Sequence, residues 1–205
     1  NGFDEEDFKA SVSVPSSDKF RVSHVGMLNV FRNPEWFWKV LNEMVAADEF
    51  GEDLEIEFVG MLSVDVLATF QDHTHLVLLI QKHNYLPHTE VLEKYRQSSV
   101  LLLLQNNSEN AKGHLPGKFF EYLGADRRIL CVGSKESDLT EILDKTKSGT
   151  VFEQTDADQL KTFLREAYQD WKNGNSNSNA EEISDFGRRS LTKKLSELLN
   201  TLGTR

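Results

Sequence analysis

Short apolar runs alternate along the chain with longer segments in which apolar residues recur every three or four positions. The runs are typical of β-strands, and the spaced segments are typical of helices with one buried face. The predicted strands cover residues 20–27, 53–62, 76–81, 100–105, 128–133 and 150–153. The predicted helices cover residues 34–46, 88–97, 138–145, 157–171 and 181–202, with two more starting near residues 63 and 116. This alternation predicts an α/β fold, a Rossmann-like parallel sheet with helices on both faces. Its continuous apolar strands, such as residues 76–81, are expected to be buried on both sides.

Composition changes divide the chain into four segments. Residues 1–18 are polar and acidic, which indicates a hinge or linker segment. Residues 19–174 carry the alternating pattern and form the predicted domain. Residues 175–180 include the run NSNSN and indicate a second linker. Residues 181–205 are predicted to form a C-terminal amphipathic helix, with acidic groups first and basic groups later, as the helix dipole favours.

Net charge and hydropathy exclude some classes of partner. The formal net charge is -10, and so acidic a surface repels a phosphate backbone, which makes nucleic acid an unsuitable partner. The longest apolar runs are far shorter than the roughly 20 residues that span a bilayer, so no transmembrane segment is predicted. No leader pattern opens the sequence, and we expect a cytoplasmic protein, with a peripheral membrane location as the alternative for the full-length protein. The single cysteine, Cys131, lies in an apolar run and is expected to be a buried thiol.

The segment HLPGKFFEYLG, residues 114–124, carries the strongest chemical signal. A loop after the predicted fourth strand enters a helix at Pro116, so the amides of Gly117 and its neighbours have no partner inside the helix. These amides and the helix dipole favour a phosphate oxygen, and Lys118 adds positive charge at the same end. Glu121 follows one turn later, where its carboxylate is able to accept hydrogen bonds from the two hydroxyls of a ribose.

Two other loops follow strands of the predicted sheet. In a parallel α/β sheet, ligands bind beyond the carboxyl ends of the strands, so these loops are expected at the same edge. Gly26 ends the first strand, and Arg32 precedes the next helix, where its guanidinium is able to reach a diphosphate. Tyr85 and Leu86 follow the third strand and are placed to flank a planar base. Taken alone, Arg32 is more typical of a surface charge, and Tyr85 is more typical of a turn with a packing tyrosine.

The ordered set of these motifs resembles the C-terminal domain of GT-B glycosyltransferases, and glycosyltransferase family 4 most of all. The resemblance covers nearly the whole chain. It rests on the hinge-like residues 1–4, the loops 26–33 and 84–88, the segment 114–124 with the strand after it, and the terminal helix, which resembles the one that crosses to the N-terminal domain.

This resemblance implies transfer of a glycosyl group, of the hexosyltransferase type, from a UDP- or GDP-linked sugar with retention of anomeric configuration and with neither metal nor cofactor. It implies that Arg32 and Lys118 are the catalytic residues that stabilise the leaving diphosphate. Glu121 would bind the ribose, Pro116 and Gly117 the diphosphate, and Tyr85 and Leu86 the base, with Gly26 in the glycine-rich loop. The acceptor would bind an N-terminal domain that is missing from these 205 residues, so the chain alone is expected to be inactive.

The sequence departs from the family pattern at two positions. Gly113 stands where many members carry a second glutamate, and Met27 stands where an arginine usually follows the first-strand glycine. Other signals favour structural roles. Asp156 and Asp158 lie at a helix start, where aspartate caps amides, although they also spell a metal motif of another transferase class. His24 lies inside a predicted strand and is expected to be a satisfied core or rim histidine.

Three alternative functions stay open. A nucleotide-sugar epimerase has the same architecture. A receiver-like regulatory domain needs acidic residues after its first strand and an aspartate after its third, where this chain has Gly26-Met27 and Gln81-Lys82. A degenerate fold that only binds partners would bind no nucleotide.

Overall fold

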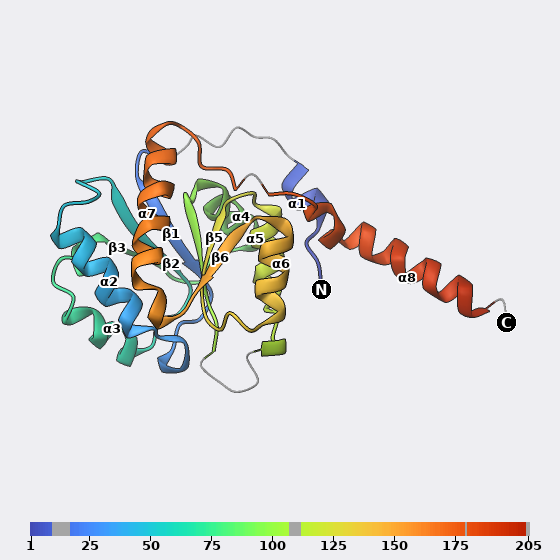
Figure 1. Cartoon of the computed structure of the whole chain (residues 1–205), viewed down its shortest axis with the longest axis horizontal. Coiled ribbons are helices and arrows are strands. Elements are labelled where there is room, and N and C mark those ends of the chain that lie inside the picture. Colours follow the sequence, from blue (N-terminus) through green and yellow to red (C-terminus); the bar gives the residue numbers. More distant parts are fainter. Residues whose placement is uncertain (10–16, 107–111, 179, 204–205) are drawn as a thin grey trace.

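Six parallel strands form the sheet around which the chain is built (Figure 1). The computed structural model describes residues 1–9, 17–106, 112–178 and 180–203. In chain order the strands are β1 Phe20–Val25, β2 Leu54–Val59, β3 Ile80–His83, β4 Val100–Leu104, β5 Arg128–Val132 and β6 Gly149–Phe152. Their order across the sheet is β3-β2-β1-β4-β5-β6, and every described pairing is parallel. The predicted Rossmann-like α/β fold is therefore confirmed.

Helices cover both faces of the sheet. The helices α2 Glu35–Ala46, α3 Val64–Gln71 and α7 Ala157–Lys172 pack on one face, and α4 His88–Gln97, α5 Gly117–Gly124 and α6 Asp138–Thr146 pack on the other. The alternation of side chains along β4 explains this arrangement. Leu102 and Leu104 belong to the first core, whereas Leu101 and Leu103 belong to the second. Because β4 needs apolar residues on both faces, its sequence is a continuous apolar run.

The direction in which successive strands are added to the sheet changes between β1 and β4. From β1 it proceeds to β2 and β3 on one side, and from β4 it proceeds to β5 and β6 on the other. The pairing of β1 with β4 extends only to Ser23 and Leu101, so the two strands separate before their carboxyl ends. This switch point is the place where open α/β sheets form a ligand-binding crevice.

The N-terminal segment meets the turn before the last helix beside α5. Phe3 pairs with Gly187, donating its amide to the carbonyl of Phe186 at 3.2 Å, and the amide of Arg188 returns to the carbonyl of Phe3 at 2.9 Å. The short helix α1 Glu5–Lys9 follows, and Phe8 contacts Phe3 edge to face. The helix α8 Arg188–Gly203 then extends away from the sheet (Figure 1).

The structure corrects two element predictions. The third strand begins at Ile80, because Val77–Leu79 forms a 3-10 turn. Strand β3 lies at the sheet edge, and its side chains are exposed or half-buried rather than buried on both sides. The terminal helix begins at Arg188 rather than at residue 181, because Ile183–Phe186 forms a separate 3-10 turn that ends at Gly187. The acidic residues before Arg188 therefore do not belong to the first turn of α8.

Candidate functional site

Helix α5 is attached to the end of β1 at the switch point. The Nζ atom of Lys118 donates to the carbonyl oxygen of Val25 at 2.7 Å, and the amide of Val25 donates to the hydroxyl of Tyr122 at 3.1 Å. These backbone groups need side-chain partners because β1 and β4 have already separated at this point. The first turn of α5 is thereby held against the crevice. Among the described residues, the amides of Gly117 and Lys118 have no hydrogen-bond acceptor.

His24 is buried beside Lys118 and has a defined hydrogen-bonding arrangement. Its Nδ1 atom lies 2.9 Å from the carbonyl oxygen of Leu102, which only accepts, so Nδ1 carries the proton. The other ring nitrogen, Nε2, is then an acceptor and lies 3.5 Å from Nζ of Lys118. Burial, and then the charge of Lys118, hold the pKa of His24 well below its usual value. His24 is therefore a neutral, satisfied core histidine, as its place in a strand predicts, and it also contacts the candidate site.

The ammonium group of Lys118 is poorly solvated. Burial, and then the positive charge of Arg32, lower its pKa from the usual 10.5 to about 7. Within the described residues, no carboxylate forms an ion pair with Lys118. A partly buried cation without a paired anion favours an anionic ligand, because such a ligand restores the lost stabilisation of the charge.

Gly26 permits this close approach. Its backbone has φ of 115°, which L side chains rarely adopt, and a Cβ atom there would lie 3.3 Å from Nζ of Lys118. Gly60, at the end of β2, packs against Gly26 so closely that a Cβ atom would lie 2.7 Å from the Gly26 carbonyl oxygen. Position 26 therefore favours glycine for its backbone conformation, and position 60 favours glycine for its conformation and for space.

Glu121 is held by two side chains from α4. Its Oε1 atom lies 3.2 Å from Nε2 of His88, and its Oε2 atom accepts a hydrogen bond of 2.9 Å from the hydroxyl of Tyr95. Burial raises the pKa of Tyr95, so the phenol stays a donor. Each carboxylate oxygen still has a further lone pair, and the side chain is 29% exposed, so Glu121 is able to accept bonds from a ligand as well.

Arg32 lies at the β1 side of the crevice and contacts the loop after β4. It lies in the 3-10 turn Val30–Arg32, and its Nε atom donates to Oδ1 of Asn106, just after β4. Two loops that the sequence places 74 residues apart are thus connected across the switch point. The predicted loop after β4 continues through residues 107–111, which lie outside the described residues.

Tyr85 and Leu86 lie next to the start of α4, close in sequence to His88. Tyr85 is 89% exposed and lines a cavity of about 270 Å³ with Gly60, Met61 and Lys82 among others. Leu86 packs against the core beneath α4 and α5. The contact between His88 and Glu121 connects this loop to α5.

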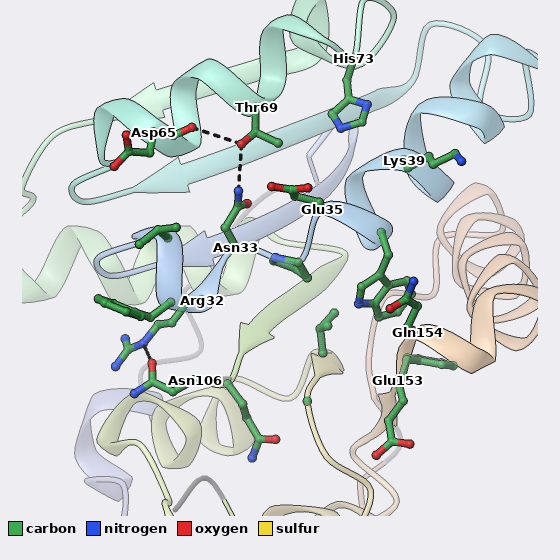
Figure 2. Close-up of a pocket in the computed structure, with 18 of the residues that line it drawn as sticks. Arg32, Asn33, Glu35, Lys39, Asp65, Thr69, His73, Asn106, Glu153 and Gln154 are labelled. Carbon is green, nitrogen blue, oxygen red and sulfur yellow. Dashed lines mark hydrogen bonds between the residues drawn. The ribbon is translucent and has the colours of Figure 1, made fainter. Parts of the chain in front are cut away.

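A larger cavity, of about 1050 Å³, opens on the α2–α3 side of Arg32 (Figure 2). Its lining includes residues 30–36, residues of α3, and the turns after β4, β5 and β6. Arg32 is the member of the predicted site that lines it. Gly26, Lys118 and Glu121 do not line it, so the cavity and the predicted site meet only at Arg32.

The structure therefore brings the predicted residues together in part. Gly26, Gly117, Lys118 and the end of β1 form one cluster, to which Pro116 contributes the helix cap. His24, Tyr95 and Asn106 contact the predicted residues, but no functional role was predicted for them. Their burial, helical spacing and loop position were readable from the sequence, whereas their partners depend on the packing of distant elements.

The first aspartate of the other transferase motif, Asp156, has a structural role. Asp156 accepts the amide of Glu153 at 2.8 Å in a capping box and pairs with Lys135 at 2.6 Å. Among the described residues, no group of three or more His, Cys, Asp or Glu side chains is arranged to hold a metal ion. Across the same residues, no helix combines the length and apolar composition needed to cross a bilayer.

Comparison with known proteins gives structural matches. No family model matches the chain, and no curated protein matches it by sequence. HepE from Anabaena, in complex with UDP, matches 98% of this chain and 56% of its own, with a TM-score of 0.74 and 14% identity. Sucrose-phosphate synthase from Thermosynechococcus elongatus matches 99% of this chain and 51% of its own, with a TM-score of 0.70 and 13% identity. TarM from S. aureus matches 90% of this chain and 36% of its own, with a TM-score of 0.67 and 14% identity.

The chain has the fold of one half of a GT-B glycosyltransferase. It spans about half the length of HepE and of sucrose-phosphate synthase, and about a third of TarM. At such low identity the match establishes the fold, and the function rests on the site itself.

Proposed function

We propose that this chain is the nucleotide-sugar-binding domain of a glycosyltransferase. The observation that carries the proposal is Lys118, a cation without an ion-pair partner among the described residues, held at the switch point beside two unbonded amides of α5. This arrangement favours the diphosphate of a nucleotide-sugar. HepE, whose fold matches, has been crystallised with UDP and with UDP-glucose, which supports a nucleotide-sugar ligand here.

The chemistry assigned to the site is stabilisation of a departing diphosphate. Negative charge develops on the leaving group as the glycosyl bond breaks, and preformed donors stabilise that charge without further reorganisation. Lys118, Arg32 and the α5 amides supply such donors from the protein itself. We therefore propose transfer that needs no metal, with Arg32 and Lys118 as the catalytic residues and with retained anomeric configuration, as in the family that the sequence resembles.

The nucleoside is assigned to the α4–α5 side of the crevice. Glu121 would accept hydrogen bonds from the ribose hydroxyls, with its orientation fixed by His88 and Tyr95. Tyr85, which is mostly exposed, and Leu86 would flank the base. Pro116 and Gly117 place the start of α5, so that its amides face the diphosphate.

The acceptor is assigned to a second domain outside these 205 residues. The described part of the chain contains one sheet, and the GT-B proteins that it matches are roughly two to three times as long. Positioning both reactants contributes about 7–11 kcal/mol to catalysis, which one wall of a cleft does not provide. We expect the chain alone to bind a nucleotide-sugar and to transfer no sugar to a broad acceptor panel, as judged by mass spectrometry. Efficient turnover would contradict this assignment.

Calorimetry with UDP, GDP, ADP and the corresponding nucleotide-sugars tests the proposal. We expect one of the UDP or GDP series to bind, and Lys118→Met to weaken that binding by about tenfold or more, since a charged hydrogen bond contributes about 1.5–3 kcal/mol. Lys193→Met, which removes an exposed lysine of α8, is the matched control. Absence of binding by every nucleotide would favour a partner-binding fold, and epimerised free donor in the same samples would favour an epimerase.

A further inference from the structure

The cavity beside Arg32 has a lining unlike that of the nucleotide site. It contains four carboxylates, from Glu35, Asp65, Asp72 and Glu153, and two cations, from Arg32 and Lys39. An excess of carboxylates repels phosphate and other anions, so the cavity does not suit a second nucleotide. The same polar groups make it unsuitable for a lipid chain, whose burial would leave them without hydrogen bonds.

Many polar side chains of this lining have unused hydrogen-bonding capacity. Within the described part of the chain, six of them form neither a hydrogen bond nor an ion pair: Glu35, Lys39, Asp65, Asp72, His73 and Gln154. Figure 2 shows Thr69 of α3 and His73 of the turn after it on one side, Gln154 on the opposite side, and Glu35 between them. Acceptors and donors therefore surround the cavity from three elements.

The wall of the cavity is fixed in advance. The side chain of Asn33 accepts a bond of 2.7 Å from the indole of Trp38 and donates one of 3.0 Å to the hydroxyl of Thr69. Thr69 in turn donates to the carbonyl oxygen of Asp65 at 3.2 Å. Trp38 is fully buried, so this chain of bonds anchors α3 to the start of α2 (Figure 2). A cavity whose shape is fixed in this way loses little entropy on binding.

Two aromatic side chains complete the lining. Phe31, in the 3-10 turn Val30–Arg32, is 70% exposed, and Trp36 is partly buried against the core. Exposed aromatic surface next to carboxylates and amides suits a ligand with C–H faces and with hydroxyls that both donate and accept. The volume of about 1050 Å³ lies just above the usual range of small-molecule sites, about 300–1,000 Å³.

We propose that this cavity is a binding site for a neutral saccharide of two or more sugar units. The hydroxyls would bond to the carboxylates and to Gln154, and a sugar face would pack on Phe31. The site is separate from the nucleotide site and adjoins it at Arg32. The inference goes beyond the proposed function and does not depend on it, because none of these contacts involves Lys118 or Glu121.

Saturation-transfer NMR with maltotriose, cellotriose and triacetylchitotriose tests the proposal, with titration of each probe that responds. We expect at least one neutral probe to bind. Phe31→Ala and Gln154→Ala should each weaken it about fivefold, the effect of losing about 1 kcal/mol. Leu78→Ala and Gln71→Ala remove an exposed apolar and an exposed amide side chain outside the cavity, and they should leave saccharide binding unchanged.

Measurement of UDP binding on the same variants separates this proposal from the nucleotide site. We expect UDP affinity to stay within about twofold in Phe31→Ala and Gln154→Ala, since neither removes a proposed nucleotide contact. Three results would overturn the proposed saccharide site: no binding of any of the three probes, unchanged saccharide affinity in both variants, or displacement of the saccharide by UDP. A failure to bind UDP, with saccharide binding intact, would instead count against the nucleotide site.

Discussion

The Nζ atom of Lys118 donates a hydrogen bond of 2.7 Å to the carbonyl oxygen of Val25, which joins the first turn of α5 to the end of β1. This bond uses one of the three protons of the ammonium group, and Nε2 of His24 lies at 3.5 Å from the same nitrogen. The lysine is thus fixed at the switch point before any ligand arrives. A charge held in place in a poorly solvated position is effective in binding and in catalysis, because little has to rearrange.

The low pKa of Lys118 predicts pH-dependent binding. Its pKa of about 7 means that the ammonium form is nearly complete at pH 6 and scarce at pH 8. We expect the affinity for UDP-glucose, whose diphosphate does not titrate in this range, to fall about tenfold from pH 6 to pH 8 as the cation is lost. Calorimetry at both values checks this, and Lys118→Met should show a flat profile. A wild-type profile as flat as that of the variant would remove Lys118 from the site.

The same shift predicts how stability depends on pH without ligand. The folded-state pKa lies below the usual 10.5, so between pH 7 and pH 10.5 the unfolded chain binds more protons than the folded one. The unfolding free energy contributed by this group therefore rises with pH across that window. Below pH 7 the folded state is destabilised by the full cost of holding the poorly solvated ammonium group. Urea denaturation at pH 7 and pH 9 should show a larger increase in unfolding free energy with pH for wild type than for Lys118→Met. Equal gains would mean that Lys118 is solvated.

Replacing Glu121 tests the ribose contact. We expect Glu121→Ala to weaken nucleotide binding about tenfold or more, because a charged hydrogen bond contributes about 1.5–3 kcal/mol. The change also leaves the Tyr95 hydroxyl without its partner, so circular dichroism has to establish that the variant is folded. Glu90→Ala, which removes an exposed carboxylate of α4, is the control. Unchanged affinity in a folded Glu121→Ala protein would contradict the assignment.

Gly26 should not tolerate a side chain. Alanine there would have to adopt φ near 115° and would place Cβ 3.3 Å from Nζ of Lys118. We expect Gly26→Ala to lose about 1–3 kcal/mol of stability and to bind nucleotide more weakly. Gly51→Ala is the matched control, since Gly51 has φ of 54° with open space around it. Equal effects of the two changes on thermal unfolding and on affinity would show that the loop after β1 is not constrained in this way.

The outer part of α8 should be dispensable for folding. Leu195, Leu198, Leu199 and Leu202 are 55–62% exposed, so removing residues 195–205 uncovers little core. We expect the melting temperature to change by no more than about 2 °C, whereas Phe3→Ala should cost about 3 kcal/mol or more, because Phe3 is buried. Unfolding of the truncated chain would place this part of α8 in the domain core.

The sequence by itself determined the elements and their order. The six strands and the helices of the sheet were readable because a buried parallel strand needs a continuous apolar run, and a covering helix needs an apolar stripe. The prediction of a buried strand at residues 76–81 was wrong, since residues 77–79 form a 3-10 turn and the edge strand begins only at residue 80. The glycine at position 26 and the start of α5 were readable for similar local reasons.

Only the tertiary structure decided which side chains meet. The sequence offered Lys118, Arg32 and Glu121 as separate loop and helix residues, but it contained nothing that paired them with Val25, Asn106 and Tyr95. Those pairs are 93, 74 and 26 residues apart. The first two form because β1 and β4 are neighbours that separate at the switch point, and the third forms because α4 and α5 pack on the same face of the sheet. The order of strands is set by long-range packing, which a local pattern does not encode. For the same reason the cavity beside Arg32 became visible only once α2, α3 and the turns after β5 and β6 stood together.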